Sequence, residues 1–404
     1  MSNIYRSNTR PATFGGGNRR PKYGNNNSNN SSRRPRAQYI DPARFVRAAR
    51  PSAELEYTAT HQFSDFDIHD ALRANLTAKG YVTPSPIQDQ TIPQALEGKD
   101  IIGVANTGTG KTAAFAIPVL NQLAQDRTSR ALIIAPTREL AQQIEMECRS
   151  IAKGSGLTGT LLIGGANIGP QLRDLKNKPR IVIGTPGRIK DHLERRTLDL
   201  SSFNLVVLDE VDRMLDMGFI NDVREILSQL NTKRQSFFFS ATLDSRVRTL
   251  IQAFSNDPVT VSLKQSDTSE NVNQDVVRFS SSNEKMDKLH DILLREDVEK
   301  IIVFDETQRK VERLNQELHE RGFSTDAIHG GKSQGQRQRA LDRFKKNQVN
   351  ILVATDVAAR GIDVVDITHV INFSQPQSYD DYVHRIGRAG RAGRVGHALT
   401  FVSH

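Results

Sequence analysis

The sequence is poor in cysteine and in long hydrophobic runs. Its single cysteine, Cys148, can form neither an intrachain disulfide nor a thiolate metal cluster. We therefore expect a small packed side chain there, and a protein that works in a reducing compartment, the cytoplasm. No stretch reaches the roughly 18 apolar residues of a membrane span, and no apolar signal-peptide core follows the first methionine. We expect neither secretion nor membrane insertion.

Acidic residues are nearly absent from the first fifty positions, which hold eleven Arg or Lys and a single Asp. The net charge is +9, so the excess of positive charge belongs to this segment. Because the segment is also rich in Gly, Asn, Ser and Pro, we expect residues 1–60 to be a disordered basic tail. It would tether nucleic acid by charge, with Tyr5, Phe14, Tyr23 and Tyr39 stacking on bases. The alternatives are a solvated linker and, less consistent with the Asn and Gly runs, a cleaved transit peptide.

The remaining chain contains short apolar runs separated by stretches with helical patterns. With 404 residues, of which 37% are hydrophobic, it is long enough for two or three domains. Such runs favour parallel strands in doubly wound α/β sheets. We expect two α/β domains, over residues 61–263 and 274–404, joined by a polar linker over residues 264–273. The expected strands are 101–104, 131–135, 160–163, 180–183, 205–208, 236–239 and 259–261, then 276–279, 301–304, 327–328, 351–353, 370–372 and 399–402.

A glycine-rich segment follows the first of these runs and precedes a helix-forming stretch. Strand, loop and helix in this order indicate a phosphate-binding loop with Ala in place of its first Gly. The glycines let backbone N–H groups close around phosphates, Lys111 reaches the terminal phosphates, and the Thr112 hydroxyl ligates Mg²⁺. The candidate nucleotide-binding residues of the loop are Ala105, Asn106, Thr107, Gly108, Thr109, Gly110, Lys111 and Thr112.

Three carboxylates, Asp209, Glu210 and Asp212, follow the buried run at 205–208. Clustered acids at the end of a buried strand are costly unless a positive group lies beside them. Mg²⁺ is typically held by one or two carboxylates together with phosphate oxygens. We expect Asp209 to hold Mg²⁺ and Glu210 to orient and deprotonate the attacking water, so the leading chemistry is nucleoside triphosphate hydrolysis. The alternative is that the acids cap a following helix.

The side chain of Gln88 indicates that the base of the bound nucleotide is adenine. The side-chain amide offers a donor and an acceptor, which match the edge of adenine. Phe63 lies upstream of Gln88 and can stack on the base. The alternative is a loop in which Ser85 caps a helix and Phe63 is an ordinary core residue.

The motifs, taken in order, resemble those of the DEAD-box RNA helicases. The first domain supplies Gly80–Gln88, Ala105–Thr112, Pro136–Ala141, Gly164–Gly165, Thr185–Arg188, Asp209–Asp212 and Ser240–Thr242. The second supplies His329–Gly330, Gln334 with Arg337, Ala354–Asp363 and His384–Arg391. The resemblance covers roughly residues 61–404. It implies two tandem RecA-like domains that use ATP and Mg²⁺ and bind RNA.

Three departures from the family pattern stand out. Val211 occupies a position where the family has Ala, and Ala389 one where it usually has Thr. We expect both to be tolerated. Asp305 and Glu306 replace the usual Cys-Asn, and we expect these acids to repel RNA phosphates nearby.

The resemblance also implies roles in the second domain. Arg388 and Arg391, which are spaced three apart and would share one face if they are helical, would act as arginine fingers that reach the phosphates held by Lys111. The alternative is a solvated basic patch. Asp363 and Gly361 would lie at the ribose.

Coupling between ATP and RNA would involve Asp212, Ser240, Thr242 and His384. The hydroxyls of Ser240 and Thr242 could bond to Asp212 or to the arginine helix; alternatively, they cap the next helix alongside Asp244. His384 would link the domains, or it is a satisfied core histidine.

RNA would be gripped through its phosphates by backbone N–H groups, hydroxyls and guanidinium groups. Such contacts do not identify bases, so we expect weak sequence preference. The candidate residues are Arg138, Gly165, Thr185, Arg188, Arg337 and Thr355.

The leading hypothesis is a monomeric ATP-dependent RNA helicase that locally separates short duplexes, or remodels RNA–protein complexes, when its two domains close on ATP. A second is an ATP-gated RNA clamp or annealing chaperone with little strand separation. A third, a duplex-translocating DNA helicase, is disfavoured by the motifs at Gly80–Gln88 and Asp209–Asp212.

Overall fold

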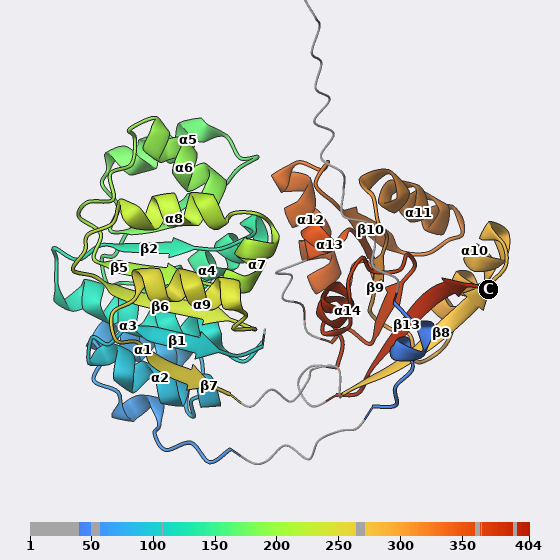
Figure 1. Ribbon diagram of the computed structural model, residues 1–404, viewed down its shortest axis with the longest axis horizontal. Helices are drawn as coiled ribbons and strands as arrows, with labels where there is room; N and C mark the ends of the chain where they lie inside the picture. Colours follow the sequence, from blue (N-terminus) through green and yellow to red (C-terminus); the bar gives the residue numbers. More distant parts are fainter. Residues whose placement is uncertain are drawn as a thin grey trace, which may run out of the picture. The chain divides into compact units, whose positions relative to one another are not determined.

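Two parallel β-sheets form the framework of the computed structural model (Figure 1). The structure describes residues 40–49, 57–106, 108–263, 271–359, 364, 366–390 and 394–404. None of the helices in these ranges has the length and apolar character needed to cross a bilayer. The predicted class, two doubly wound α/β domains, is confirmed.

The first sheet has seven parallel strands in the order β3-β4-β2-β5-β6-β1-β7. They are β1 (Ile101–Val104), β2 (Ala131–Ile134), β3 (Gly159–Leu162), β4 (Ile181–Gly184), β5 (Leu205–Leu208), β6 (Gln235–Ser240) and β7 (Val259–Ser262). Every residue of β1, β2, β4 and β5 is buried, as expected for strands covered on both faces. Because β6 lies between β1 and β5, the segments that follow these three strands meet at one edge of the sheet.

Helices cover both faces of the first sheet. Ile101 and its neighbour Ile102 point into opposite hydrophobic cores, as alternation along a strand requires. One core is closed by α1 (Asp70–Ala78), α2 (Pro86–Leu96), α3 (Lys111–Gln125) and α4 (Arg138–Ile151). The other is closed by α5 (Ile168–Lys176), α6 (Pro186–Glu194), α7 (Val211–Asp216), α8 (Ile220–Ser228) and α9 (Ser245–Phe254).

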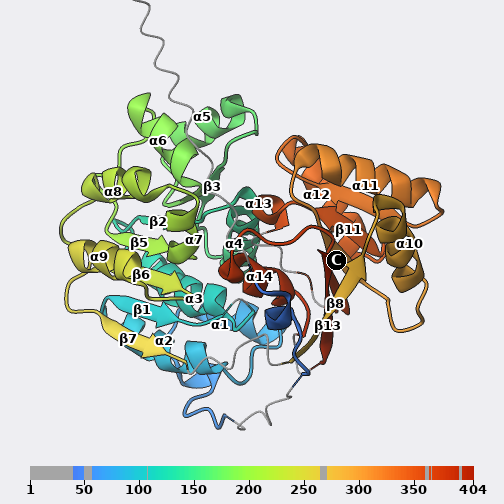
Figure 2. The ribbon, with the colours of Figure 1, turned by 45° about the vertical axis from the view of Figure 1, so that its right-hand side comes forward.

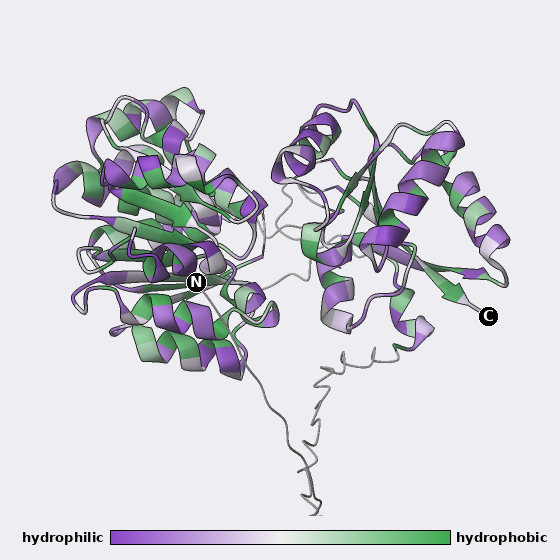
Figure 3. Cartoon of the chain, turned by 90° about the horizontal axis from the view of Figure 1, so that it is seen from above, coloured by the Kyte–Doolittle hydropathy of each residue, from purple (hydrophilic) through white to green (hydrophobic). Residues whose placement is uncertain are grey.

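The second sheet has six parallel strands in the order β10-β11-β9-β12-β13-β8. They are β8 (Val272–Phe279), β9 (Ile301–Phe304), β10 (Thr325–Ile328), β11 (Ile351–Ala354), β12 (His369–Asn372) and β13 (Gly396–Ser403). One face is covered by α10 (Ser282–Leu293) and α11 (Gln308–Glu320), the other by α12 (Gln334–Lys345), α13 (Asp356–Ala359) and α14 (Tyr379–Ile386). Figure 3 shows the hydrophobic residues concentrated along the strands of both sheets.

Each predicted strand is present, and most of its ends lie within a residue or two of the prediction. The exceptions are β13, which begins at Gly396, three residues before its predicted start, and β8, which begins at Val272, inside the predicted linker. Val272 pairs with Gly396 and is buried, so the pairing with β13 extends this strand beyond its apolar run. The rest of the predicted linker, 264–270, lies outside the described residues.

A segment of the predicted tail is folded onto the second sheet. The 3-10 helix η1 (Pro42–Phe45), drawn in blue in Figure 2, lies beside β8 and α14. Phe45 is completely buried, with its ring centroid 4.6 Å from that of Tyr382. Arg47 forms an antiparallel bridge with Gln274. The expectation of disorder over residues 1–60 therefore does not hold for residues 40–49, nor for residues 57–60, where Tyr57 and Thr60 donate to Asp89. Residues 1–39 and 50–56 lie outside the described part.

Replacing Phe45 by Ala is expected to release this segment from the second sheet. The loss of a fully buried Phe costs about 3 kcal/mol, which corresponds to roughly a hundredfold faster exchange of the amides it protects. The amides of Arg47 and Gln274, which bond to each other's carbonyls at 2.9 and 2.7 Å, are the ones to follow by hydrogen exchange. Val46→Ala is the control, because Val46 is 54% exposed. Equal exchange in both variants would contradict the assigned anchor.

Candidate nucleotide and RNA site

The phosphate-binding loop lies where β1 ends and α3 begins. Gly108 and Gly110 have φ angles of 87° and 92°, a left-handed conformation that favours glycine. Lys111 opens α3, is buried, and donates from Nζ to the Ala105 carbonyl at 2.9 Å. Asn106 and Thr109 are joined by a bond from the Thr109 hydroxyl to the Asn106 carbonyl at 2.9 Å. Thr107 lies outside the described residues.

Gln88 holds this loop against the start of α2. Its Nε2 donates to the Gly110 carbonyl at 3.1 Å, and its Oε1 accepts from the Ser85 backbone N–H at 2.9 Å. The Ser85 hydroxyl donates to the Thr109 carbonyl at 2.8 Å. A Cβ at Gly110 would lie 2.4 Å from Gln88 Nε2, so the close approach also requires glycine. The structure thus gives Gln88 a contact that the sequence did not predict, while adenine binding by Gln88 stays a prediction.

The acids after β5 are buried at the same edge of the sheet. Asp209 and Glu210 are 2% and 4% exposed. Glu210 has a left-handed backbone (φ 56°), which is uncommon for a residue with a side chain. Its Oε2 accepts from Arg213 Nη1 at 2.9 Å. Both Asp209 and Glu210 line the cavity that Lys111 also lines, so this turn directs the two acids toward the phosphate loop.

The two carboxyls have opposite pKa shifts. Burial raises the pKa of Asp209 despite the positive charge of Lys111, so its ionised form is destabilised. Burial also opposes ionisation of Glu210, but the charges of Arg213 and Lys111 outweigh it and lower its pKa. A cation beside Asp209 would stabilise its charge, and a firmly ionised Glu210 is suited to accept hydrogen bonds.

One cavity of about 300 Å³ brings together residues predicted from three separate motifs. This volume is at the lower end of the range for small-molecule sites. Its lining consists of Tyr81, Gly108, Gly110, Lys111, Thr112, Ala113, Leu140, Gln143, Glu147, Asp209, Glu210 and Arg388. The phosphate loop, the acid pair and one predicted arginine finger therefore face a common space.

Arg388 reaches this cavity from a turn rather than from a helix. Helix α14 ends at Ile386 with Gly387 as its C-cap, so the expectation that Arg388 and Arg391 share a helical face is wrong for Arg388. Arg388 is 4% exposed. Arg391 lies outside the described residues, as do the predicted ribose contacts Gly361 and Asp363.

Phe63 and Tyr81 line a second cavity of about 170 Å³. Their rings meet edge to face, with centroids 5.1 Å apart, and Phe63 is 4% exposed. Tyr81 also lines the phosphate cavity, so it contributes to both cavities. The Tyr81 hydroxyl donates to Glu147 Oε1 at 3.0 Å, and burial, reinforced by the negative charge of Glu147, raises the pKa of Tyr81. Tyr81 and Glu147 were not predicted from the sequence as site residues. The one feature of the sequence that could have indicated them is the aromatic side chain at position 81, beside the predicted base-binding motif.

The predicted coupling residues form a network on the first domain. Asp212 Oδ2 accepts from the backbone N–H groups of Ala241 and Thr242, at 3.1 and 3.0 Å, and from the Thr242 hydroxyl at 3.3 Å. The Ser240 hydroxyl instead donates to the Thr242 carbonyl at 2.7 Å. Helix α9 is capped by Asp244, which accepts from Val247 N–H at 2.8 Å, so neither hydroxyl is needed as a cap.

His384 lies on α14 and lines a small hollow with Asp356, Arg385 and Arg388. Burial raises the pKa of Glu210, and the charge of His384 adds to the larger effects of Arg213, Lys111 and Arg388 that together lower it. The histidine is therefore electrostatically connected to the acid pair.

Four predicted RNA contacts lie on the first domain. Arg138 begins α4, and its guanidinium covers Gly165, where a Cβ would lie 2.1 Å from Nη1. Thr185 precedes α6 as its N-cap. Arg188, one turn into α6, has its Nη1 buried without a hydrogen-bond partner among the described residues. A buried guanidinium nitrogen with no acceptor is suited to a phosphate oxygen.

The second domain supplies Arg337 and Thr355. Arg337 lies on α12 and its Nη2 is 2.8 Å from Glu139 Oε2, an ion pair in which both side chains are buried. Burial and, to a lesser extent, the charge of Arg337 lower the pKa of Arg138, so these two predicted phosphate ligands repel each other. Thr355 follows β11, and its backbone carbonyl accepts from the N–H groups of Ala358 and Ala359 in α13, at 3.1 and 2.9 Å. Glu139 was missed as the partner of Arg337.

The departures from the family pattern are accommodated locally. Val211 and Ala389 are completely buried in apolar cores, as expected for tolerated replacements. Asp305 is buried, which raises its pKa, and the charges of Lys310 and Lys285 act on it. Glu306 pairs with Lys310. These lysines offset part of the negative charge that was expected to repel RNA.

Comparison with known proteins gives one consistent family. The DEAD/DEAH box helicase model matches residues 85–250, and the helicase conserved C-terminal domain model matches residues 284–393. The ATP-dependent RNA helicase CshA of Limosilactobacillus reuteri is 43% identical over 344 residues, which cover 85% of this chain and 69% of that protein. The DEAD-box ATP-dependent RNA helicase CshA of Bacillus subtilis is 43% identical over 346 residues, covering 85% of this chain and 70% of that protein.

A solved structure agrees in fold. Dbp5 of S. cerevisiae bound to RNA and ADP BeF3 matches with a TM-score of 0.74 at 28% identity, over 85% of this chain and 89% of that chain. The two family models match consecutive parts of the chain, and both relatives align with 85% of it, so these comparisons agree on one family. The chain belongs to the DEAD-box family of ATP-dependent RNA helicases.

Proposed function

We propose that this helicase acts as a monomer that hydrolyses ATP with Mg²⁺ and uses the energy to separate short RNA duplexes locally. The observation that carries the proposal is the single cavity lined by Lys111, the Asp209–Glu210 pair and Arg388. A cytoplasmic location is proposed from the lone, buried cysteine, which cannot form an intrachain disulfide.

Lys111, Thr112 and Asp209 would hold the charged end of the nucleotide. The Lys111 ammonium would turn from the Ala105 carbonyl, 2.9 Å away, to the phosphates. Asp209 and Thr112 fit Mg²⁺, because the charge of the buried carboxylate needs a cation and the hydroxyl lines the same cavity. When bound, Mg²⁺ would neutralise phosphate charge.

Glu210 and Arg388 would act on the reacting atoms. The lowered pKa of Glu210 makes its carboxylate a weak base, so we assign it mainly to orienting the attacking water. Arg388 would stabilise the charge that develops on the transferred phosphoryl group. Because these side chains come from different domains, hydrolysis would require domain closure.

RNA would bind through its phosphates to Arg138, Arg188 and Arg337, together with Gly165, Thr185 and Thr355. The support is electrostatic: burial and Arg337 lower the pKa of Arg138, and Arg188 has a buried nitrogen without an acceptor. An RNA phosphate would stabilise the charge of Arg138 and would supply a hydrogen-bond acceptor for the buried nitrogen of Arg188. Such contacts would give weak base preference.

Replacing Arg188 by Ala is expected to weaken RNA binding about tenfold to a hundredfold, because a charge-assisted hydrogen bond is lost. The dependence of log affinity on log salt concentration should become shallower by about 0.7. Anisotropy of a labelled single-stranded RNA over a range of KCl concentrations measures both.

Arg195→Ala is the matched control for this variant. Arg195 and Arg188 both pair with Asp191, at 2.5 and 3.7 Å, but the Arg195 side chain is 57% exposed. The control therefore removes a charge and an Asp191 contact without removing the proposed phosphate ligand. An equal loss in the two variants would refute the specific role of Arg188.

Strand separation is tested with a short blunt RNA duplex, protein and ATP. Release of the labelled strand that requires ATP would support the helicase proposal. RNA-stimulated hydrolysis without release, or faster annealing of complementary strands, would instead establish the clamp or chaperone activity. Removing the residues before position 40 leaves the segment that packs on β8 in place. If that truncated chain alone loses unwinding at moderate salt, the basic tail is a tether.

A further inference from the structure

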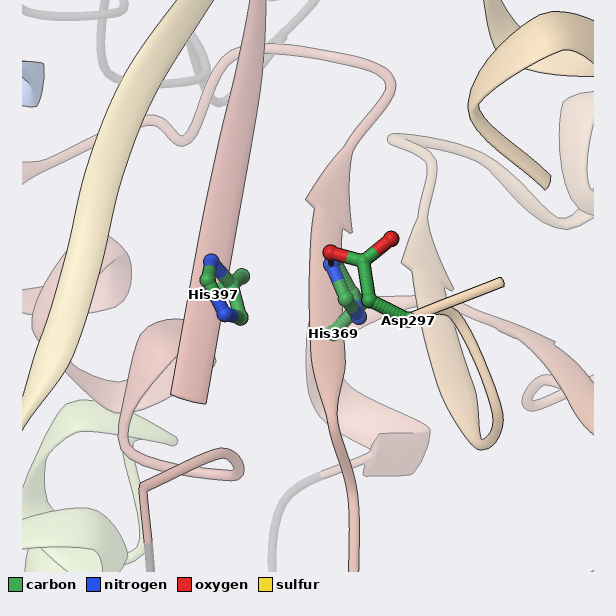
Figure 4. A group of neighbouring side chains, drawn as sticks. All are labelled: Asp297, His369 and His397. Atoms are coloured by element: carbon green, nitrogen blue, oxygen red, sulfur yellow. Dashed lines mark ion pairs between the residues drawn. The ribbon is translucent and has the colours of Figure 1, made fainter. Parts of the chain in front are cut away.

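Two histidines and an aspartate lie together in the second domain, and the nucleotide and RNA sites use none of them. His369 and His397 occupy paired positions on the neighbouring strands β12 and β13. Their rings stack, with centroids 4.7 Å apart and planes 12° apart. Asp297, in the loop before β9, extends its carboxylate toward the His369 ring (Figure 4).

The surroundings of His369 place its two ring nitrogens differently. Nδ1 lies 3.1 Å from the Thr368 hydroxyl, which also accepts from the backbone N–H groups of Glu299 and Lys300, both at 3.2 Å, and donates to the Lys300 carbonyl at 3.2 Å. Nε2 is the nitrogen that faces Asp297. Metal-binding histidines are commonly oriented by a hydrogen bond of the other ring nitrogen.

Nε2 of His369 faces Asp297 Oδ2 at 3.7 Å, which is too long for a hydrogen bond. Nε2 and Oδ2 are both atoms of the kind that bind metal ions, and a cation between them would be attracted to the carboxylate. Arg295 is the neighbouring cation whose charge acts on His369, but its effect is smaller than that of Asp297.

We propose that Asp297, His369 and His397 form a binding site for a divalent transition-metal ion, of which Zn²⁺ is the best match. Two imidazoles and one carboxylate are a donor set that Zn²⁺ accepts, with a fourth position left for water. The metal would join the loop before β9 to the first residues of β12 and β13.

The site needs a modest closure to bind the ion. The three ligand atoms lie within 4.8 Å of one another, whereas ligands of tetrahedral Zn²⁺ are about 3.4 Å apart. His369 is almost fully buried and would be the fixed ligand. Asp297, whose side chain is 61% exposed, and the half-buried His397 would move toward it.

Calorimetric titration of the untagged full chain with Zn²⁺, in excess Mg²⁺ and without nucleotide, tests the site. We expect one bound Zn²⁺ per chain and a rise in melting temperature when it binds. His397→Ala and Asp297→Asn should each weaken Zn²⁺ binding at least tenfold and remove that rise. Asp297→Asn keeps the test decisive if the His397 variant folds poorly, because residue 297 is exposed.

Two matched variants control for the general loss of a histidine or an acid. His319→Ala removes an exposed histidine on α11, and Glu296→Gln removes an exposed acid next to Asp297. Both should bind Zn²⁺ like the parent chain. Absence of Zn²⁺ binding by the parent chain, or equal affinity in the Asp297 and Glu296 variants, would overturn the proposal.

Discussion

Replacing Arg388 by Ala is expected to lower RNA-stimulated ATP hydrolysis by about 10³- to 10⁵-fold, or roughly 4 to 7 kcal/mol of transition-state stabilisation. Arg388 is 4% exposed and lines the same cavity as Lys111 and Glu210. No other described residue of the second domain lines this cavity. ATP binding should change little, because the phosphate loop lies in the first domain. Steady-state kinetics with saturating RNA, together with direct binding of a fluorescent ATP analogue, separates the two effects.

The control for Arg388 is Arg313→Ala, an exposed arginine on α11. That variant should hydrolyse ATP at the parent rate. Arg388→Lys keeps the positive charge but loses the planar fork that binds phosphate oxygens in pairs, so it should recover part of the rate at most. If Arg388→Ala keeps full activity with RNA, or if its melting temperature falls enough to account for the loss, the arginine-finger assignment fails.

The strands and the place of the site were predictable, because residues suited to bind phosphate or a metal ion directly follow short buried runs. Ile101–Val104 and Leu205–Leu208 are completely buried strands, and the glycine loop and the acid pair follow them directly. In a parallel sheet, such ends meet at one edge. Sequence order alone therefore predicted that Lys111, Asp209 and Glu210 share a site.

Other features depend on contacts between segments far apart in the sequence. The packing of Phe45 against Tyr382 joins positions separated by most of the chain, and composition indicated only a polar tail. The bond from Gln88 to the Gly110 carbonyl also joins separate elements, across 22 residues of sequence. The end of α14 at Ile386, before Arg388, depends on the turn that starts at Gly387, which the spacing of the arginines did not reveal.

The histidine pair at 369 and 397 had no signal in the sequence. The two residues become neighbours only because β12 and β13 pair in a register that places them side by side. A shift of one residue would move one ring to the opposite face of the sheet. Register, unlike the presence of the strands, is not determined by apolar runs that are buried on both faces.

Replacing Glu210 by Gln is expected to give a helicase that binds ATP and RNA but barely hydrolyses ATP. Gln keeps the size of the side chain and can still accept from Arg213 Nη1, now 2.9 Å from Glu210 Oε2. It lacks the negative charge that would orient the attacking water. We expect kcat to fall about 10²- to 10⁴-fold, with KM for ATP nearly unchanged. Because the cycle would stop before phosphate release, labelled RNA should dissociate more slowly with ATP present than without it.

The neighbouring substitution Val211→Ala distinguishes loss of chemistry from local disorder. Val211 is completely buried at the start of α7, so its truncation loosens the same turn without touching a carboxylate. This variant should melt earlier than the parent chain yet hydrolyse ATP at a similar rate, because both acids remain. Glu210→Gln should show the reverse: a rate loss far larger than its change in melting temperature explains. Normal turnover by Glu210→Gln would remove Glu210 from the reaction. Loss of ATP binding in that variant would instead make the Glu210–Arg213 pair a structural support of the cavity.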